Sequence, residues 1–327
     1  MERRDSGHSS GLWVVGPNRL ERRSSALSPL DAGLNRVRTL FSGISRGTER
    51  LVLEGRVPEA EYQRMACPRQ RGQFPFPVLY GYAAVGQVEE GPLSGQSVFC
   101  LNPHETLFDA PTEWLVPVPA SVPPRRAVLA ANLETALNGM WDSGAGPGDR
   151  ILVVGGGVVG GLIAALAARL PGAEVTLVDP MPTRAALAAT IGCAWQAHGQ
   201  GLSDFDIVFH TSAHETGLAT AIAAAGREAR IVELSWYGAG SVAAPLGGAF
   251  HALRLTLQSS QVGEISPSRR PRWTHRRRLE KALSLLADPV FDAFITHEIA
   301  FTEAESRLPT ILSRDTDALM PVLVYGD

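Results

Sequence analysis

The chain has 327 residues, of which 45% are hydrophobic and 19% are charged, with a formal net charge of −3 at pH 7. This composition is typical of a globular protein with room for two domains, and it excludes a disordered chain. The weak negative charge gives no long-range attraction for nucleic acid or anionic lipid, so we expect neither as a partner. No apolar stretch approaches the roughly 20 residues of a membrane-spanning helix without a charge or a glycine.

Cysteine usage favours a reducing compartment. The three cysteines, Cys67, Cys100 and Cys193, are odd in number and far apart in the sequence. They are unsuited to a disulfide framework and too few for a zinc lobe of four cysteines. We therefore expect a cytoplasmic protein.

Residues 11–124 carry short β-prone runs between glycines and prolines, a pattern that predicts a small, irregular β domain. The runs are LWVV, VRTLF, VLYGYAAVGQV, SVFCL and TEWLVPVP. Residues 1–10 are polar, and we expect them to form a disordered tail. A helical pattern starts near Arg125 and stops at glycine, after which PGDR predicts a turn into a buried strand.

Residues 125–266 alternate between predicted strands and helices. The strand ILVV leads through glycines into the apolar segment LIAALAARL, and AEVTLVD and TRAALAATIG follow, which is the order of a βαβ unit. Further strands are predicted at FDIVFH, ARIVELSWYG and LTLQSS, with helix-compatible segments between them. We expect a doubly wound parallel sheet, so the fold class is α/β, a Rossmann domain with a second, β-rich domain.

Residues 267–327 are predicted to return to the first domain. They hold a helix at RRLEKALSLLAD, a strand around ITHEIAF, a short helix around EAESRLPTILS and a last strand at MPVLVY. An arginine-rich run from Arg269 to Arg278 leads into the first of these helices. It could bind a phosphate or carboxylate, or it could be the solvated start of a helix.

The segment GGGVVG has the GxGxxG pattern of a dinucleotide site, as Gly155, Gly157 and Gly160. The first glycine permits a tight turn, the second lets the backbone approach a pyrophosphate, and the third lets the helix pack on the strand. The amides at the helix start, including those of Val158 and Val159, and the helix dipole attract an anion. Because the pattern lies between a predicted strand and helix, we expect a nicotinamide dinucleotide here.

Asp179 ends the next predicted strand, about 20 residues after Gly160. A carboxylate at that place accepts hydrogen bonds from the adenosine ribose and repels a 2′-phosphate, which favours NAD(H) over NADP(H). Asp179 could instead cap the following helix. Arg184, one helical turn further, keeps NADP(H) open, although it could simply lie beside the adenine.

Side chains at the carboxyl ends of parallel strands line the crevice where a cofactor binds. His210 follows FDIVFH at such an end, so it could contact a ribose or the nicotinamide, or serve only as a cap. Trp236 and Tyr237 follow IVELS and could wall the nicotinamide or the substrate, or pack in the core. His104, in LNPHETLF, is expected to be a loop residue rather than a catalyst.

The motifs SGISRGTE (residues 42–49), GYAAVGQV (81–88), AANLETALNG (130–139) and VVGGGVVGGLIAALA, with Asp179, resemble the medium-chain dehydrogenase/reductase superfamily. These are the zinc alcohol dehydrogenases and their zinc-less relatives. SGISRGTE is similar to a branch with bacteriochlorophyllide dehydrogenase-like proteins and actinobacterial proteins described as zinc-binding dehydrogenases. The resemblance covers nearly the whole chain after Gly11. It implies a GroES-like catalytic domain of residues 11–124 and 267–327, and a Rossmann domain of residues 125–266.

Several residues that hold zinc in that family are replaced. The family's cysteine in a G-x-C turn corresponds to Ser45, and the His and Glu of its Gly-His-Glu turn correspond to Tyr82 and Ala83. Glu134, in LET, matches a position where many members place a ligand or near-ligand carboxylate. A catalytic zinc needs three protein ligands, so we expect no zinc and no other metal. The family's structural zinc lobe is also missing, because its segment holds only Cys100.

Without a metal, a positioned donor must stabilise the developing oxyanion while the nicotinamide transfers hydride. Tyr82 is our first candidate for the proton donor, with Ser45 or Thr48 relaying and Glu49 or Glu134 orienting. Tyr82 could instead be a packed aromatic side chain that fills the volume of the metal.

We expect an NAD(H)-dependent oxidoreductase that interconverts a hydroxyl and a ketone on a small biosynthetic intermediate without zinc. A zinc-less NAD(P)H-dependent reductase of an activated C=C bond is one alternative. A non-catalytic protein that binds the cofactor is another. The resemblance further implies a homodimer formed through the edge of the Rossmann sheet.

Overall fold

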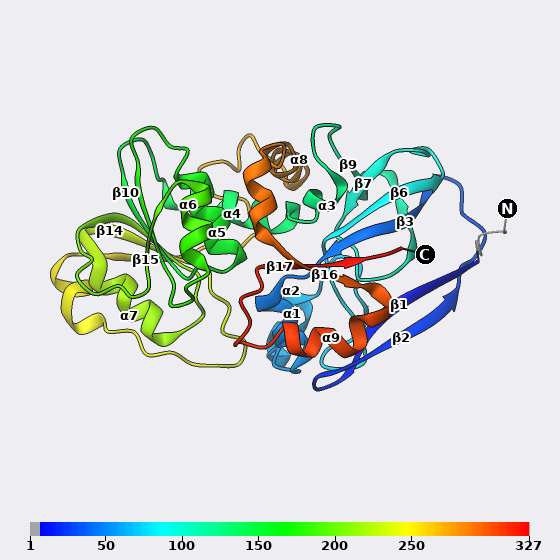
Figure 1. The fold of residues 1–327 in the computed structure, drawn as a ribbon, viewed down its shortest axis with the longest axis horizontal. Coiled ribbons are helices and arrows are strands. Elements are labelled where there is room, and N and C mark those ends of the chain that lie inside the picture. The colour runs from blue at the N-terminus through cyan, green and yellow to red at the C-terminus, as the bar shows by residue number, and fades with distance from the viewer. Residues whose placement is uncertain (1–6, 327) are drawn as a thin grey trace. The chain divides into compact units, whose positions relative to one another are not determined.

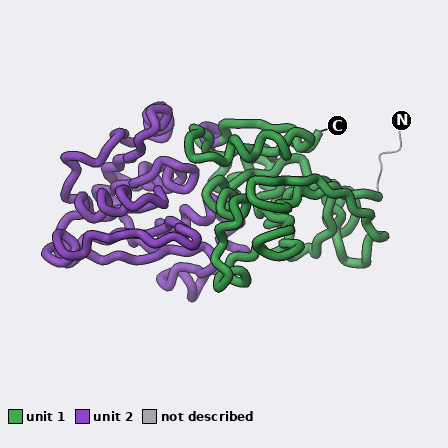
Figure 2. The backbone as a smooth tube through the Cα atoms, turned by 90° about the horizontal axis from the view of Figure 1, so that it is seen from below, with its two compact units in different colours: residues 1–131, 283–291, 295–327 green, residues 132–282, 292–294 purple. Residues whose placement is uncertain are grey.

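The computed structural model describes residues 7–326. The chain divides into two compact units, one of residues 1–131, 283–291 and 295–327 and one of residues 132–282 and 292–294 (Figure 2). Sequence analysis drew the boundaries after residues 124 and 266, whereas the structure counts residues 125–131 with the first unit and the segment 267–282 with the second unit. The difference has a physical reason, since Arg278 of that segment is bound to side chains of the second unit, as described below.

The first unit is built from two sheets that are largely antiparallel (Figure 1). One has the order β2-β1-β5-β4 and consists of β2 (Arg19–Ala26), β1 (His8–Gly16), β5 (Val78–Leu79) and β4 (Arg71–Gly72). The other has the order β16-β17-β3-β6-β7-β9, with β8 beside β3. Its strands are β16 (Ile295–Ala300), β17 (Met320–Val324), β3 (Leu34–Gly43), β6 (Ala84–Glu90), β7 (Ser97–Cys100), β9 (Val116–Pro117) and β8 (Leu107–Pro111). Within it only β16 and β17 run parallel.

The predicted tail of residues 1–10 is wrong in part. His8, Ser9 and Ser10 belong to β1 and pair with Ala26, Ser25 and Ser24. Residues 1–6 lie outside the described part of the chain. The strand forms although its start is polar, because the partner strand and the buried Ser9 side chain supply hydrogen bonds that the sequence pattern does not reveal.

The helices of the first unit are short: α1 (Arg46–Leu53), α2 (Tyr62–Met65), α3 (Pro124–Ala127) and α9 (Ala304–Ile311). Helix α1 begins after Ser45, whose backbone N–H donates to the Glu49 carboxylate at 2.8 Å. This contact satisfies an amide at the helix start and ties the candidate residues of SGISRGTE to one turn.

The second unit holds a six-stranded, all-parallel sheet of order β12-β11-β10-β13-β14-β15. The strands are β12 (Ala194–Gln196), β11 (Glu174–Val178), β10 (Arg150–Val154), β13 (Phe205–His210), β14 (Ala225–Glu233) and β15 (Thr256–Ser259). The order reverses between β10 and β13, so the predicted doubly wound sheet is confirmed. The carboxyl ends of β10 and β13 therefore flank a topological switch point.

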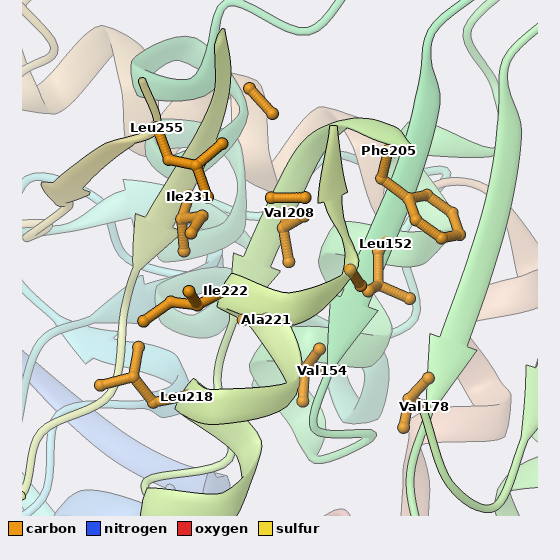
Figure 3. Close-up of a cluster of buried hydrophobic side chains, with 13 residues drawn as sticks. Leu152, Val154, Val178, Phe205, Val208, Leu218, Ala221, Ile222, Ile231 and Leu255 are labelled. Atoms are coloured by element: carbon orange, nitrogen blue, oxygen red, sulfur yellow. The ribbon is translucent and has the colours of Figure 1, made fainter. Parts of the chain in front are cut away.

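Helices of the second unit are α4 (Ala130–Ser143), α5 (Val158–Ala167), α6 (Arg184–Ile191), α7 (Glu215–Ala224) and α8 (His275–Leu285), the first and last of which run across its boundary. Helix α7 lies away from α5 and α6 in Figure 1, as expected when right-handed crossovers leave a sheet in opposite directions. Side chains of α7 pack on β13 and β14 in a buried apolar cluster that includes Leu218, Ile222, Val208 and Ile231 (Figure 3). This cluster fixes the strands whose carboxyl ends carry the candidate cofactor residues.

No helix within residues 7–326 is long and apolar enough to cross a membrane. Cys67, Cys100 and Cys193 are free thiols, and the first two are buried.

Candidate functional site

The glycine turn after β10 is closed so tightly that two of its positions exclude any side chain. Gly155 has a φ of +110°, and a Cβ there would lie 2.7 Å from the backbone N of Ser212. A Cβ on Gly160 would lie 1.9 Å from the Gly155 carbonyl oxygen and 2.4 Å from the hydroxyl of Thr211. The first and third glycines of the motif therefore form the tight turn and close helix packing that the sequence predicts.

The second glycine of the motif starts the helix and faces open space. Gly157 is exposed and is the N-cap of α5, and a Cβ there would meet nothing within 4 Å. No side chain of the described residues caps this helix, so the amides of Val158, Val159 and Gly160 remain available to an anion. These residues thus fit the pyrophosphate of a dinucleotide.

Asp179 lies directly after β11 and is tied to the glycine turn. Its Oδ2 accepts the N–H of Gly156 at 2.7 Å, and its Oδ1 accepts the N–H of Met181 at 2.9 Å. Each carboxylate oxygen keeps a further lone pair, so Asp179 can still accept hydroxyl hydrogens of a ribose. Arg184 is buried, and its stem packs close to Gly156.

The carboxyl ends of three adjacent strands lie in register. Val154, the last residue of β10, pairs with His210 of β13, and His210 pairs with Glu233 of β14. His210 is fully buried, with its Nδ1 2.7 Å from Glu233 Oε2 and its Nε2 2.7 Å from the Ser212 hydroxyl. Gly217 of α7 permits this arrangement, because a Cβ there would lie 2.2 Å from that hydroxyl.

Residues of the loop after β14 extend this cluster. The Ser235 N–H donates to Glu233 Oε1 at 2.7 Å, and the Tyr237 hydroxyl donates to Glu233 Oε2 at 3.2 Å. Trp236 lies between them in the sequence and is partly buried. Burial alone would raise the pKa of Glu233, but the hydrogen bond and charge interaction with His210 and the hydrogen bonds from Ser235 outweigh burial and lower the pKa. The structure thus places a carboxylate at this edge of the sheet.

In the first unit, three of the predicted catalytic residues form one hydrogen-bonded group. The hydroxyl of Tyr82 is hydrogen-bonded to the side chains of Ser45 and Thr48. Burial is the main cause that raises the Tyr82 pKa above its usual range, and the nearby Glu49 charge adds to it, while the bonds to Ser45 and Thr48 oppose both. The Tyr82 phenol is therefore protonated at neutral pH and can donate a hydrogen bond.

Glu49 is the first member of a second group of side chains that are hydrogen-bonded in sequence. Its Oε2 lies 2.8 Å from His104 Nε2, and His104 Nδ1 lies 2.7 Å from the Ser42 hydroxyl. That hydroxyl is in turn 2.9 Å from the hydroxyl of Tyr325. Gly81 lies against the imidazole, since a Cβ there would be 2.8 Å from Nε2. Glu49 is thus held by Ser45 on one side and His104 on the other.

Glu134 belongs to the second unit and forms a buried ion pair there. Its Oε1 accepts from Arg278 Nε at 2.8 Å, and the guanidinium also donates to Asn138 Oδ1 at 2.6 Å and to the Glu264 carbonyl at 3.2 Å. Arg278 is only 1% exposed, so this last residue of the arginine run is not part of a solvated helix start. Burial raises the pKa of Glu134 even though Arg278 acts in the opposite direction.

Three of the residues that sequence analysis compared with zinc ligands are bonded to other side chains. Ser45 and Tyr82 offer hydroxyls that bond to each other, and Glu134 is engaged by Arg278. Zinc in proteins is bound by thiolate, imidazole and carboxylate. Within residues 7–326 no three His, Cys, Asp or Glu side chains are grouped as such ligands.

Sequence analysis missed several members of these clusters. His104 was assigned to a loop, and neither Ser42 nor Tyr325 was singled out, because their partners lie far away in sequence. Glu233 lay inside the predicted strand ARIVELSWYG, whereas the structure ends β14 at Glu233, as β13 ends at His210. Reading the register of parallel strands would have placed it beside His210.

Solved structures of dehydrogenases match the chain over almost its whole length, whereas no protein-family model matches it. L-idonate 5-dehydrogenase from Escherichia coli K-12 has a TM-score of 0.79 at 17% identity, with 97% of this chain and 98% of that chain covered. A short chain alcohol dehydrogenase from Escherichia coli CFT073, complexed with NADH, has a TM-score of 0.77 at 16% identity and coverage of 98% and 100%. A putative zinc-binding dehydrogenase from Sinorhizobium meliloti 1021, bound to NADP, has a TM-score of 0.77 at 17% identity and coverage of 98% and 100%. The chain therefore has the fold of the medium-chain dehydrogenases, a GroES-like β-rich domain and a Rossmann domain.

Proposed function

We propose that this protein is an oxidoreductase that uses NAD(H) to interconvert a hydroxyl and a ketone on a small biosynthetic intermediate, without a catalytic zinc. The observation that carries the proposal is the glycine turn of β10 joined to Asp179 through the Gly156 N–H. This arrangement holds an anion-binding helix start and a ribose-binding carboxylate in one rigid element. The three free thiols fit a reducing compartment such as the cytoplasm.

The cofactor preference follows from the surroundings of Asp179. The carboxylate would accept the hydroxyl hydrogens of the adenosine ribose and would repel a phosphate on its 2′ oxygen. Arg184 is buried with its stem against Gly156, so it supports the turn. NAD(H) is therefore the proposed cofactor, and NADP(H) is the alternative that the experiment below distinguishes.

The bound nicotinamide would supply or accept the hydride, and the protein would supply the proton and stabilise the oxyanion. Tyr82 is the proposed proton donor, because its raised pKa keeps the phenol protonated and its hydroxyl is already bonded to Ser45 and Thr48. These two hydroxyls would relay the proton. Glu49 would hold the start of α1 in place through the Ser45 N–H. We assign Glu134 no proton transfer, since Arg278 holds its carboxylate.

The proposal is tested by calorimetric titration of the purified protein with NADH and with NADPH. We expect NADH to bind at least about tenfold more tightly, because only NADPH carries the repelled phosphate. Replacing Asp179 by alanine should remove most of that difference. The control is Glu174→Ala, which removes an exposed carboxylate at the opposite end of the same strand.

Three outcomes would change the proposal. A preference of the wild type for NADPH would contradict the role of Asp179 and favour the C=C reductase. Failure to bind either cofactor would contradict the oxidoreductase altogether. If a ketone screen finds a substrate, Tyr82→Phe should lower kcat by about 10²-fold or more while leaving NADH affinity unchanged. Full activity of that variant would exclude Tyr82 as the donor.

A further inference from the structure

Glu233 lies on the side of the sheet toward which the nicotinamide half of a dinucleotide would extend if its pyrophosphate bound the glycine turn. The carboxyl ends of β11, β10, β13 and β14 follow one another across the sheet. Asp179 at the end of β11 marks the adenosine side, and the glycine turn at the end of β10 takes the pyrophosphate. The remaining nucleoside, with its nicotinamide, must then lie toward β13 and β14. Glu233 is in register with Val154, two strands away, and strands are about 4.8 Å apart.

Every hydrogen bond of this cluster can be made with a neutral His210, in which case the cluster bears one negative charge, on Glu233. A neutral imidazole satisfies both contacts of His210, with Nδ1–H donating to Glu233 and Nε2 accepting the Ser212 hydroxyl hydrogen. The Tyr237 hydroxyl and the Ser235 N–H are neutral donors to the same carboxylate. The structure pairs no arginine or lysine with Glu233 in the part of the chain that it describes. No fixed positive charge therefore cancels that of the carboxylate.

The Glu233 side chain is also shielded from solvent and held in one place. It is 15% exposed, and its two oxygens accept hydrogen bonds from three residues. Hydrogen bonds from His210 and Ser235, together with the electrostatic interaction with His210, lower the pKa of Glu233 against the opposing effect of burial, so the group is ionised at neutral pH. A charge in such a setting is screened less by salt and water than an exposed one.

The two forms of the cofactor differ in charge at the nicotinamide. The ring of NAD⁺ is cationic, and the ring becomes neutral when it accepts a hydride. We propose that Glu233 makes this site selective for the redox state of its cofactor, because its carboxylate stabilises the cationic ring of NAD⁺ and not the neutral ring of NADH. The inference rests on the proposed function, since it requires a nicotinamide dinucleotide on the glycine turn.

The test is calorimetric titration of the full chain with NAD⁺, NADH and AMP at one pH and one salt concentration. In Glu233→Gln, which keeps the size and one acceptor oxygen, we expect NAD⁺ to bind about fivefold to tenfold more weakly. NADH should change by less than about twofold, and AMP, which has only the adenosine half, should not change. The matched control is Glu228→Gln in the same strand, where the carboxylate is exposed and paired with Arg254. It should leave the affinities for all three ligands as in the wild type.

The outcomes separate this inference from the proposed function. If NAD⁺ and NADH weaken equally in Glu233→Gln, or if AMP weakens as well, the residue supports the fold and the inference is overturned. If none of the three ligands binds the wild type, the proposed function itself fails. If Glu233→Gln does not fold, the inference is tested on the wild type, by comparing its affinities for NAD⁺ and NADH. NADH that binds more than about tenfold tighter than NAD⁺ would contradict a stabilised cationic ring. If NADP(H) proves to be the cofactor, NADP⁺ and NADPH replace the first two ligands.

Discussion

Replacing Glu134 by alanine should destabilise the second unit without a direct effect on chemistry. The change leaves the Arg278 guanidinium, 1% exposed, with Asn138 Oδ1 and backbone carbonyls but with no counter-charge from Glu134. Removal of one partner from a buried ion pair typically costs about 3–5 kcal/mol. For a unit of this size that lowers the melting temperature by roughly 10 °C. The measurement is thermal and urea unfolding followed by circular dichroism, with AMP binding as the check on the folded state.

Removing both partners should be milder than removing one. Burial raises the pKa of Glu134 despite Arg278, which shows that the pair does not fully offset the cost of burying the carboxylate. The double change Glu134→Leu with Arg278→Met takes both charges out of the interior, and such exchanges are often neutral or stabilising. We therefore expect it to regain most of the stability that Glu134→Ala loses. A single variant within about 1 kcal/mol of the wild type, or a double variant no better than the single one, would refute this account.

Four further predictions concern the glycine turn, the thiols and the sheet edge. Gly160→Ala should abolish NADH binding, measured by calorimetry, while the protein stays folded. The reason is that the new Cβ would lie 1.9 Å from the Gly155 carbonyl oxygen. An NADH affinity within about threefold of the wild type would contradict the tight turn. Burial raises the pKa of both Cys67 and Cys100 to about 12, so iodoacetamide at pH 8.5 should label them in urea but not in the native protein. Above about pH 9 the unfolded chain loses thiol protons that the folded chain keeps, so stability should fall as pH rises toward 12. The resemblance implies a homodimer formed through the edge of the Rossmann sheet, where Leu257 of edge strand β15 is 38% exposed. Light scattering should therefore show a dimer for the wild type and a monomer for Leu257→Asp.

The parallel sheet was predictable because its signals are local. Each strand from β10 to β15 except β12 was identified from a short apolar run, and the glycine turn lies where its spacing predicts. Helices α5, α6 and α7 were equally visible as apolar segments that follow strands. By contrast, β2 has a polar and exposed sequence, and its pairing with β1 is a tertiary effect that no local pattern encodes.

The candidate site could be predicted only where its residues are close in sequence. Ser45, Thr48 and Glu49 lie in one turn, and the resemblance linked them to Tyr82. Partners at long range were not predictable, as the bonds of His104 to Glu49 and to Ser42 show. Pairings of this kind depend on which loops the folded backbone brings together, and the type of a side chain does not indicate its distant partner.

The position of β17 has a consequence for the order in which the protein folds during synthesis. This strand, residues 320–324, is inserted between β3 and β16, so the first unit lacks an inner strand until these residues leave the ribosome. Most of the second unit, residues 132–282, is continuous and is released earlier. Closing a loop from residue 43 to residue 322 is also entropically slow compared with pairing neighbouring strands. The second unit should therefore complete its fold first, and the edge of β3 that pairs with β17 should stay unpaired until β17 is synthesised.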